Sequence, residues 1–153
     1  MYDQIRDQLM ETIKELHEEA VDVAQEHWNW HLRENALREP KEKGRLNVRV
    51  RLHKGRVLEI CWLKFRFHKP EGSTKSAVKS TRIKKGRDYK YRVASLSSQA
   101  KSWEIEPVLE FEERLAKIRS EYAEVSKALV TIDRAKKKRR VRQAENEGVS
   151  HED

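Results

Sequence analysis

The sequence predicts an α+β fold, in which two long antiparallel helices carry an inserted three-stranded β-module. Near both ends of the chain, apolar residues recur at alternating steps of three and four, the spacing of a helix that packs on another helix. In the middle the period falls to two, as in half-buried strands. Charged residues make up 39% of the 153 residues, and narrow apolar stripes on long helices suit so polar a chain.

The first long helix is expected over residues 2–38, a stretch that contains neither proline nor glycine. Its apolar stripe consists of Ile5, Leu9, Ile13, Leu16, Ala20, Val23, His27 and Trp30. Because proline disfavours a helical residue before it, this helix should end shortly before Pro40.

The β-module is expected over residues 45–85. Apolar and polar residues alternate over 46–53, which predicts the first strand. Lys54-Gly55 is a plausible tight turn because glycine adopts positive φ at little cost, and a longer strand follows over 56–68. A third antiparallel strand is expected over 77–84.

A turn centred on Lys54-Gly55 also predicts how the first two strands pair. The expected pairs, which share one apolar face, are Leu52 with Val57, Val48 with Cys61 and Leu46 with Leu63. The other face would carry basic residues around Leu58, Ile60 and Trp62; these are Arg49, Arg51, Lys64, Arg66 and His68. The single cysteine, Cys61, is interpreted as a small buried apolar residue.

A short helix over 91–103 and a long helix over 107–140 should complete the fold, with Pro107 in the first turn of the long one. The long helix has an unbroken stripe, formed by Val108, Phe111, Leu115, Ile118, Tyr122, Val125, Leu129 and Ile132. An antiparallel coiled-coil hairpin would bury both stripes, and a homodimer through the same stripes is the alternative. We therefore expect a single domain over 1–142 and a disordered tail over 143–153.

Positive charge is concentrated in the middle of the chain. Residues 40–92 hold 18 basic and 4 acidic residues, whereas residues 1–39 hold 4 basic and 10 acidic ones. A basic module held by acidic helices is the arrangement that a polyanion-binding surface needs. Its candidate nucleic-acid-binding residues are Arg49, Arg51, Lys64, Arg66, Lys79, Arg82, Lys84, Lys85, Arg87, Lys90 and Arg92.

A second basic cluster lies near the end of the long helix. It is a run of five consecutive cations, Lys136, Lys137, Lys138, Arg139 and Arg140. One or two cations at a helix C-terminus complement the helix dipole, but five exceed that need. We therefore expect further phosphate contacts here.

Other functional classes find little support in the sequence. His27 and His31 have a spacing that could hold a metal, but a third ligand is missing nearby, so packing of the helix end onto the β-module is favoured. The chain has no phosphate-binding glycine loop and no nucleophile elbow, and it predicts no enzyme and no cofactor. No apolar run approaches the roughly 20 residues of a membrane span. Together with the lone cysteine, these features favour a cytoplasmic protein.

The order of features resembles the MobI-type auxiliary proteins of conjugative plasmids and integrative conjugative elements. The resemblance is carried by the acidic helix that ends in His27-Trp28-Asn29-Trp30-His31, by the basic hairpin leading to the segment 61–67 and by the Lys101-Ser102-Trp103-Glu104 step before the long helix. It implies a non-catalytic accessory protein that acts at an origin of transfer beside a separate relaxase. It assigns no catalytic residues.

The sequence and the resemblance together predict a DNA-binding accessory protein, with duplex DNA as the expected partner. An RNA-binding module is one alternative. A protein-interaction adaptor that uses the acidic helices is the other.

Overall fold

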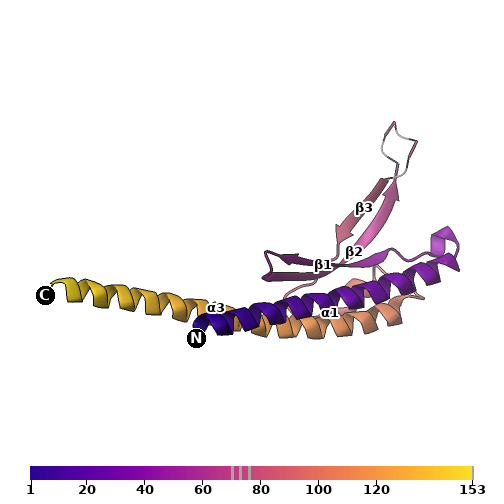
Figure 1. The fold of residues 1–153 in the computed structure, drawn as a ribbon. Coiled ribbons are helices and arrows are strands. Elements are labelled where there is room, and N and C mark those ends of the chain that lie inside the picture. Colours follow the sequence, from indigo (N-terminus) through magenta and orange to yellow (C-terminus); the bar gives the residue numbers. More distant parts are fainter. Residues whose placement is uncertain (70, 73, 76, 153) are drawn as a thin grey trace.

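The computed structural model describes residues 1–69, 71–72, 74–75 and 77–152, and it has an α+β fold. Two long helices, α1 (Tyr2–Ala36) and α3 (Ile105–Glu152), lie side by side, and a three-stranded antiparallel sheet rises from one side of the pair (Figure 1). A 3-10 turn (Pro40–Glu42) follows α1. The remaining elements are β1 (Leu46–His53), β2 (Val57–His68), β3 (Ala77–Arg82) and α2 (Val93–Ser97).

The two long helices run antiparallel, as two cross-helix ion pairs demonstrate. Arg6 near the start of α1 binds Asp133 at 3.2 Å, and Glu26 near its end binds Arg114 at 2.6 Å. The heptad stripes meet between the helices, where Ile13, Leu16, Leu115 and other stripe residues are buried. The antiparallel pair is thus confirmed, whereas coiled-coil geometry stays a prediction.

The sheet has the order β1-β2-β3, and its register differs by one residue from the prediction. The observed pairs are Leu52 with Leu58, Val48 with Trp62 and Leu46 with Lys64. The cause is a turn of three residues, Lys54-Gly55-Arg56, in which Lys54 (φ 53°) and Gly55 (φ 68°) both have positive φ. Leu58, Ile60 and Trp62 therefore belong to the buried face with Val48, because directly opposed residues of an antiparallel pair share a face.

The shifted register also separates the basic residues that we expected on one polar face. Arg49 lies opposite Cys61 and Arg51 opposite Glu59. Lys64 and Arg66 belong to the other face, because they continue the row of Ile60 and Trp62. The prediction that these four cations share one face was therefore wrong. Cys61 is buried, as expected.

The ends of the helices depart from the prediction in two places. The short helix spans only Val93–Ser97, because Glu104 accepts a hydrogen bond from the Lys101 N–H at 2.8 Å and turns the chain into α3. At the other end, α3 continues to Glu152 through the segment that we expected to be a disordered tail. That segment contains good helix formers, such as Ala144 and Glu145, and no proline. Among the helices described, none is long and apolar enough to cross a membrane.

Candidate nucleic-acid interface

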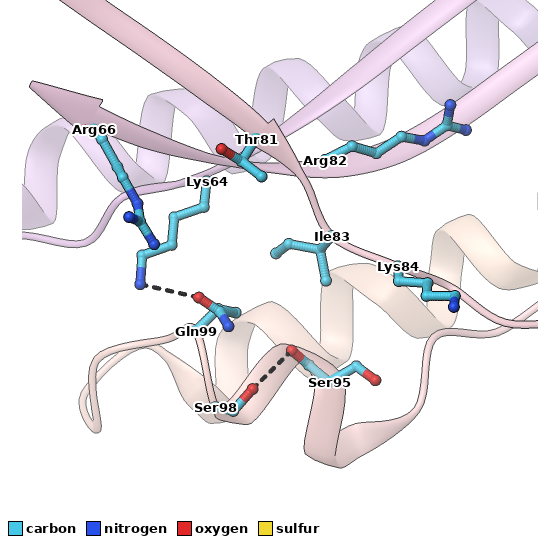
Figure 2. A pocket seen from close by; sticks show the side chains of 9 residues that line it. All are labelled: Lys64, Arg66, Thr81, Arg82, Ile83, Lys84, Ser95, Ser98 and Gln99. Atoms are coloured by element: carbon cyan, nitrogen blue, oxygen red, sulfur yellow. Dashed lines mark hydrogen bonds between the residues drawn. The ribbon is translucent and has the colours of Figure 1, made fainter.

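A basic groove of about 320 Å³ lies where the outer part of β2 and β3 faces the short helix α2. Lys64 and Arg66 reach into it from β2, and Ile83 lies between them and Lys84 (Figure 2). Lys84 lies at the far end of the groove, whereas Arg82 points away from its centre. No acidic residue is among the described residues that line it.

Two cations face each other beside this groove, on the same sheet face. Arg66 of β2 is directly opposite Lys79 of β3, and both side chains are exposed. Like charges directly opposite one another destabilise a sheet. Within the described chain, neither residue forms an ion pair with an acidic side chain. The arrangement leaves positive charge free for an anionic partner.

Neutral hydrogen-bonding groups complete the groove. Ser95, Ser98 and Gln99 lie along the α2 side, and Thr81 lies on β3. Lys64 Nζ donates to Gln99 Oε1 at 3.0 Å, which holds the ammonium group at the groove. Lysine and arginine together with serine and threonine hydroxyls are the donor set that contacts the phosphates of nucleic acids.

A buried polar network anchors the strand and the loop that flank the groove. The Glu112 carboxylate is fully buried and accepts hydrogen bonds from Trp62 Nε1 at 3.0 Å, the Tyr91 N–H at 2.7 Å and Arg119 at 3.0 Å. Arg119 also donates to the carbonyls of Ile60 at 3.0 Å and Tyr89 at 2.9 Å. The loop before α2 is therefore tied to both β2 and α3.

The structure does not bring every sequence-predicted cation to this groove. Arg49 forms an ion pair with Glu59 at 3.1 Å, and Arg82 approaches the same carboxylate at 3.9 Å. The two arginines hold the pKa of Glu59 below its usual value, although desolvation opposes them. Arg51 is exposed on the same sheet face. Because Glu59 pairs with Arg49 and Arg82, the positive charge of this second basic surface is partly neutralised.

The remaining cations of the module lie in the loop between β3 and α2. Lys85 Nζ donates to the carbonyl oxygens of Asp88 and Gly86, and so contributes to the loop itself. The others are exposed and do not line the groove; they are Arg87, Lys90 and Arg92.

The basic run of α3 lies far from the groove, where α3 passes the N-terminus of α1 (Figure 1). Lys136 is paired with Asp3 of α1, whereas the side chains of Lys137, Lys138, Arg139 and Arg140 are exposed. The helical pair ends at this point, because α1 has 35 residues and α3 has 48.

Residues 16–133 match the family model described as MobI protein, which is more than half of the chain. The chain belongs to the MobI family. This membership confirms the resemblance seen in the sequence and indicates an accessory role related to mobilisation in conjugation. Neither the curated proteins nor the solved structures contain a match.

Two of the three α1 histidines of this MobI-family chain, His27 and His31, pack as aromatic residues. His27 is fully buried and lies edge-on to Trp62 at 5.0 Å and to Phe111 at 5.3 Å, while His31 stacks on Trp28 at 5.3 Å. The expected packing of the helix end onto the β-module is thereby confirmed. No group of three or more potential metal-ligating side chains is found in the described residues.

Burial of His27 predicts a pH-dependent stability. Burial, reinforced by neighbouring His31, lowers the pKa of His27 from 6.5 to about 3. The unfolded chain therefore binds a proton that the folded chain does not, and stability should fall as the pH drops below 6.5, by up to about 1.4 kcal/mol per pH unit. Urea unfolding between pH 6.5 and 5.5, above the ordinary pKa of glutamate, measures this loss.

The matched variants are His27→Leu and His17→Leu, since His17 lies on the same helix and is only partly buried. His27→Leu should reduce the pH dependence and leave the part that comes from His31, whose pKa burial also lowers. His17→Leu should retain the full dependence. Glu104 acts in the opposite direction, because burial raises its pKa, so the two variants are compared at each pH. An unchanged pH dependence in His27→Leu would contradict the assignment.

Sequence reasoning missed the α2 side of the groove and the network beneath it. Ser95, Ser98 and Gln99 are ordinary polar residues in sequence, and only the fold brings them beside Lys64. Glu112 and Arg119 carried a detectable signal, because seven residues separate them on one helix face next to the apolar stripe.

Proposed function

We propose that this MobI-family chain is a non-catalytic DNA-binding accessory protein that grips the phosphate backbone of duplex DNA through the basic groove and assists a separate relaxase at an origin of transfer. The observation that carries the proposal is the convergence of Lys64, Arg66, Lys79 and Lys84 around one groove whose described lining holds no acid. Placing Arg66 opposite Lys79 costs stability, and phosphate binding would remove that repulsion.

The charge distribution supports the same proposal. Acidic residues dominate α1, and the module between the helices holds the excess of basic residues. DNA would be repelled by α1 and attracted to the module, which orients the complex. Since α1 and α3 bury their stripes within one chain, we propose that a single chain, rather than a homodimer through these stripes, is the binding unit.

Binding should weaken steeply with salt, because each neutralised phosphate releases a counterion. For about five contacts, log K should fall with log salt with a slope of roughly −4.5. The experiment is a fluorescence titration of a labelled duplex at several salt concentrations. Changing Lys64, Arg66 and Lys84 together to Gln should make the slope shallower by roughly 2.7 and weaken binding by at least about 10-fold at low salt.

The matched control removes three exposed cations from the acidic helices, by changing Lys14, Arg33 and Lys117 to Gln. It lowers the net charge equally and should leave the slope close to that of the wild type. Changing the run 136–140 to Gln should weaken binding less than the groove variant does. A flat salt dependence of the wild type would contradict the groove proposal. Loss of binding in the 136–140 variant but not in the groove variant would also contradict it.

A further inference from the structure

A second groove lies on the opposite side of the outer strands, against the last turns of α1. It has a volume of about 510 Å³ and is lined by aromatic and aliphatic side chains from both elements. Three large apolar side chains are unusually exposed around it: Leu32 (51%), Phe67 (54%) and Val78 (60%). In a chain this polar, a gathering of exposed apolar side chains marks a binding surface.

The groove combines flat rings with positive charge. The Arg45 guanidinium lies 4.5 Å from the centre of the Phe67 ring, so the two form a stacked platform. Trp28 also lines the groove and lies edge-on to Phe65, with their ring centres 6.0 Å apart. Lys43 is the other cation in the lining, and the described lining contains no acidic residue.

The ring of His31, which belongs to the same lining, is held in one tautomer by Asn35. The Gly44 N–H donates to Asn35 Oδ1 at 2.8 Å, so the other amide atom is the NH₂ group, which lies 3.0 Å from His31 Nε2. Nε2 is therefore the acceptor, and the proton of the neutral ring is on Nδ1. Among the described residues, Nδ1 is buried and has no partner.

We propose that this groove binds an unpaired nucleobase of a single-stranded DNA segment, which stacks on the Phe67–Arg45 platform while Lys43 contacts the adjoining phosphate. Aromatic rings and arginine planes stack on bases of any sequence, and cations beside them bind the backbone. An apolar side chain of a partner protein would use the rings, but it would leave Arg45 and Lys43 without an anion. The charge therefore favours nucleic acid. This inference rests on the proposed DNA-binding function and extends it to melted DNA.

The probe is an oligothymidylate with a single 2-aminopurine, a base whose fluorescence falls when it stacks. Adding the full-length protein should quench this fluorescence. Phe67→Ala should weaken binding of the single strand by roughly 5- to 150-fold, the range for loss of one stacked base. Phe67→Tyr should restore affinity, because it retains the ring. Duplex affinity should change less than twofold in both variants, since Phe67 is not part of the basic groove.

Two controls separate the possible outcomes. Val93→Ala shortens an equally exposed apolar side chain elsewhere and should have no effect. An oligonucleotide in which every nucleotide is abasic should bind wild type as weakly as the intact strand binds Phe67→Ala. Equal binding of the abasic and intact strands, or no effect of Phe67→Ala, would overturn the inference and point to an apolar protein partner. If salt-dependent duplex binding persists in that case, the proposed function stands; if duplex binding is also absent, both fail.

Discussion

Replacing Leu115 by aspartate is expected to unfold the protein at room temperature. Leu115 is fully buried in the core where α1, α3 and the sheet meet. Arg119, one turn further along α3, is already paired with buried Glu112. An aspartate at position 115 would therefore be a buried carboxylate without a cation of its own, which costs several kcal/mol in addition to the lost apolar contacts. Domains of this size have total stabilities of about 5–15 kcal/mol, so one such change removes most of the margin.

The measurement is a thermal melt followed by helical circular dichroism. The matched control is Lys117→Asp, which places the same side chain on an exposed position two residues further along the same helix. This control should melt within a few degrees of the wild type, because exposed substitutions change stability by about 0.5 kcal/mol or less. A cooperative melt of Leu115→Asp near the wild-type temperature would show that the stripe of α3 is not a packed seam.

The helices could be predicted from sequence because their stripes are long and regular. The stripe of α1 repeats one spacing from Ile5 to Trp30, and the stripe of α3 repeats it from Val108 to Ile132. The conformation of a single turn does not change that spacing. Strand register is less determined, since one additional turn residue moves every side chain to the other face. Lys54 adopts a positive φ that is uncommon for a residue other than glycine, and nothing in the sequence marks it.

The candidate site depended on that register. Lys64 and Arg66 were identified as binding residues, but the face they share with Lys79 was not, because it follows from the pairing of β2 with β3. The groove also needs Ser98 and Gln99, which lie more than thirty residues from Lys64 in sequence and meet it only through the network beneath. The concentration of positive charge thus predicted that the β-module binds nucleic acid. Which of its residues form the groove follows from strand pairing and from the packing of the α2 segment.

Removing the Glu112 carboxylate should cause the second largest loss of folding stability. The loss arises because the buried guanidinium of Arg119 then has no counterion. Arg119 is 8% exposed, and its guanidinium lies 3.0 Å from Glu112. Breaking a buried pair by deleting one partner costs about 3–5 kcal/mol. Glu112→Ala also deprives Trp62 Nε1 and the Tyr91 N–H of their acceptor. Urea unfolding measures the loss, with exposed Glu113→Ala as the control, expected within about 0.5 kcal/mol of the wild type.

The same variant tests whether the network supports the proposed interface. Tyr91 and the Tyr89 carbonyl tie the basic loop after Lys84 to α3, so their release should weaken duplex binding under conditions where Glu112→Ala is still folded. The double variant Glu112→Met, Arg119→Met replaces the pair by apolar side chains and should recover part of the stability, because no buried charge is left unpaired. The double variant should recover less of the duplex DNA affinity, because a methionine at position 119 cannot donate a hydrogen bond to the Tyr89 carbonyl. If Glu112→Ala costs under 1 kcal/mol, or binds duplex DNA as the wild type does, the network does not anchor the groove.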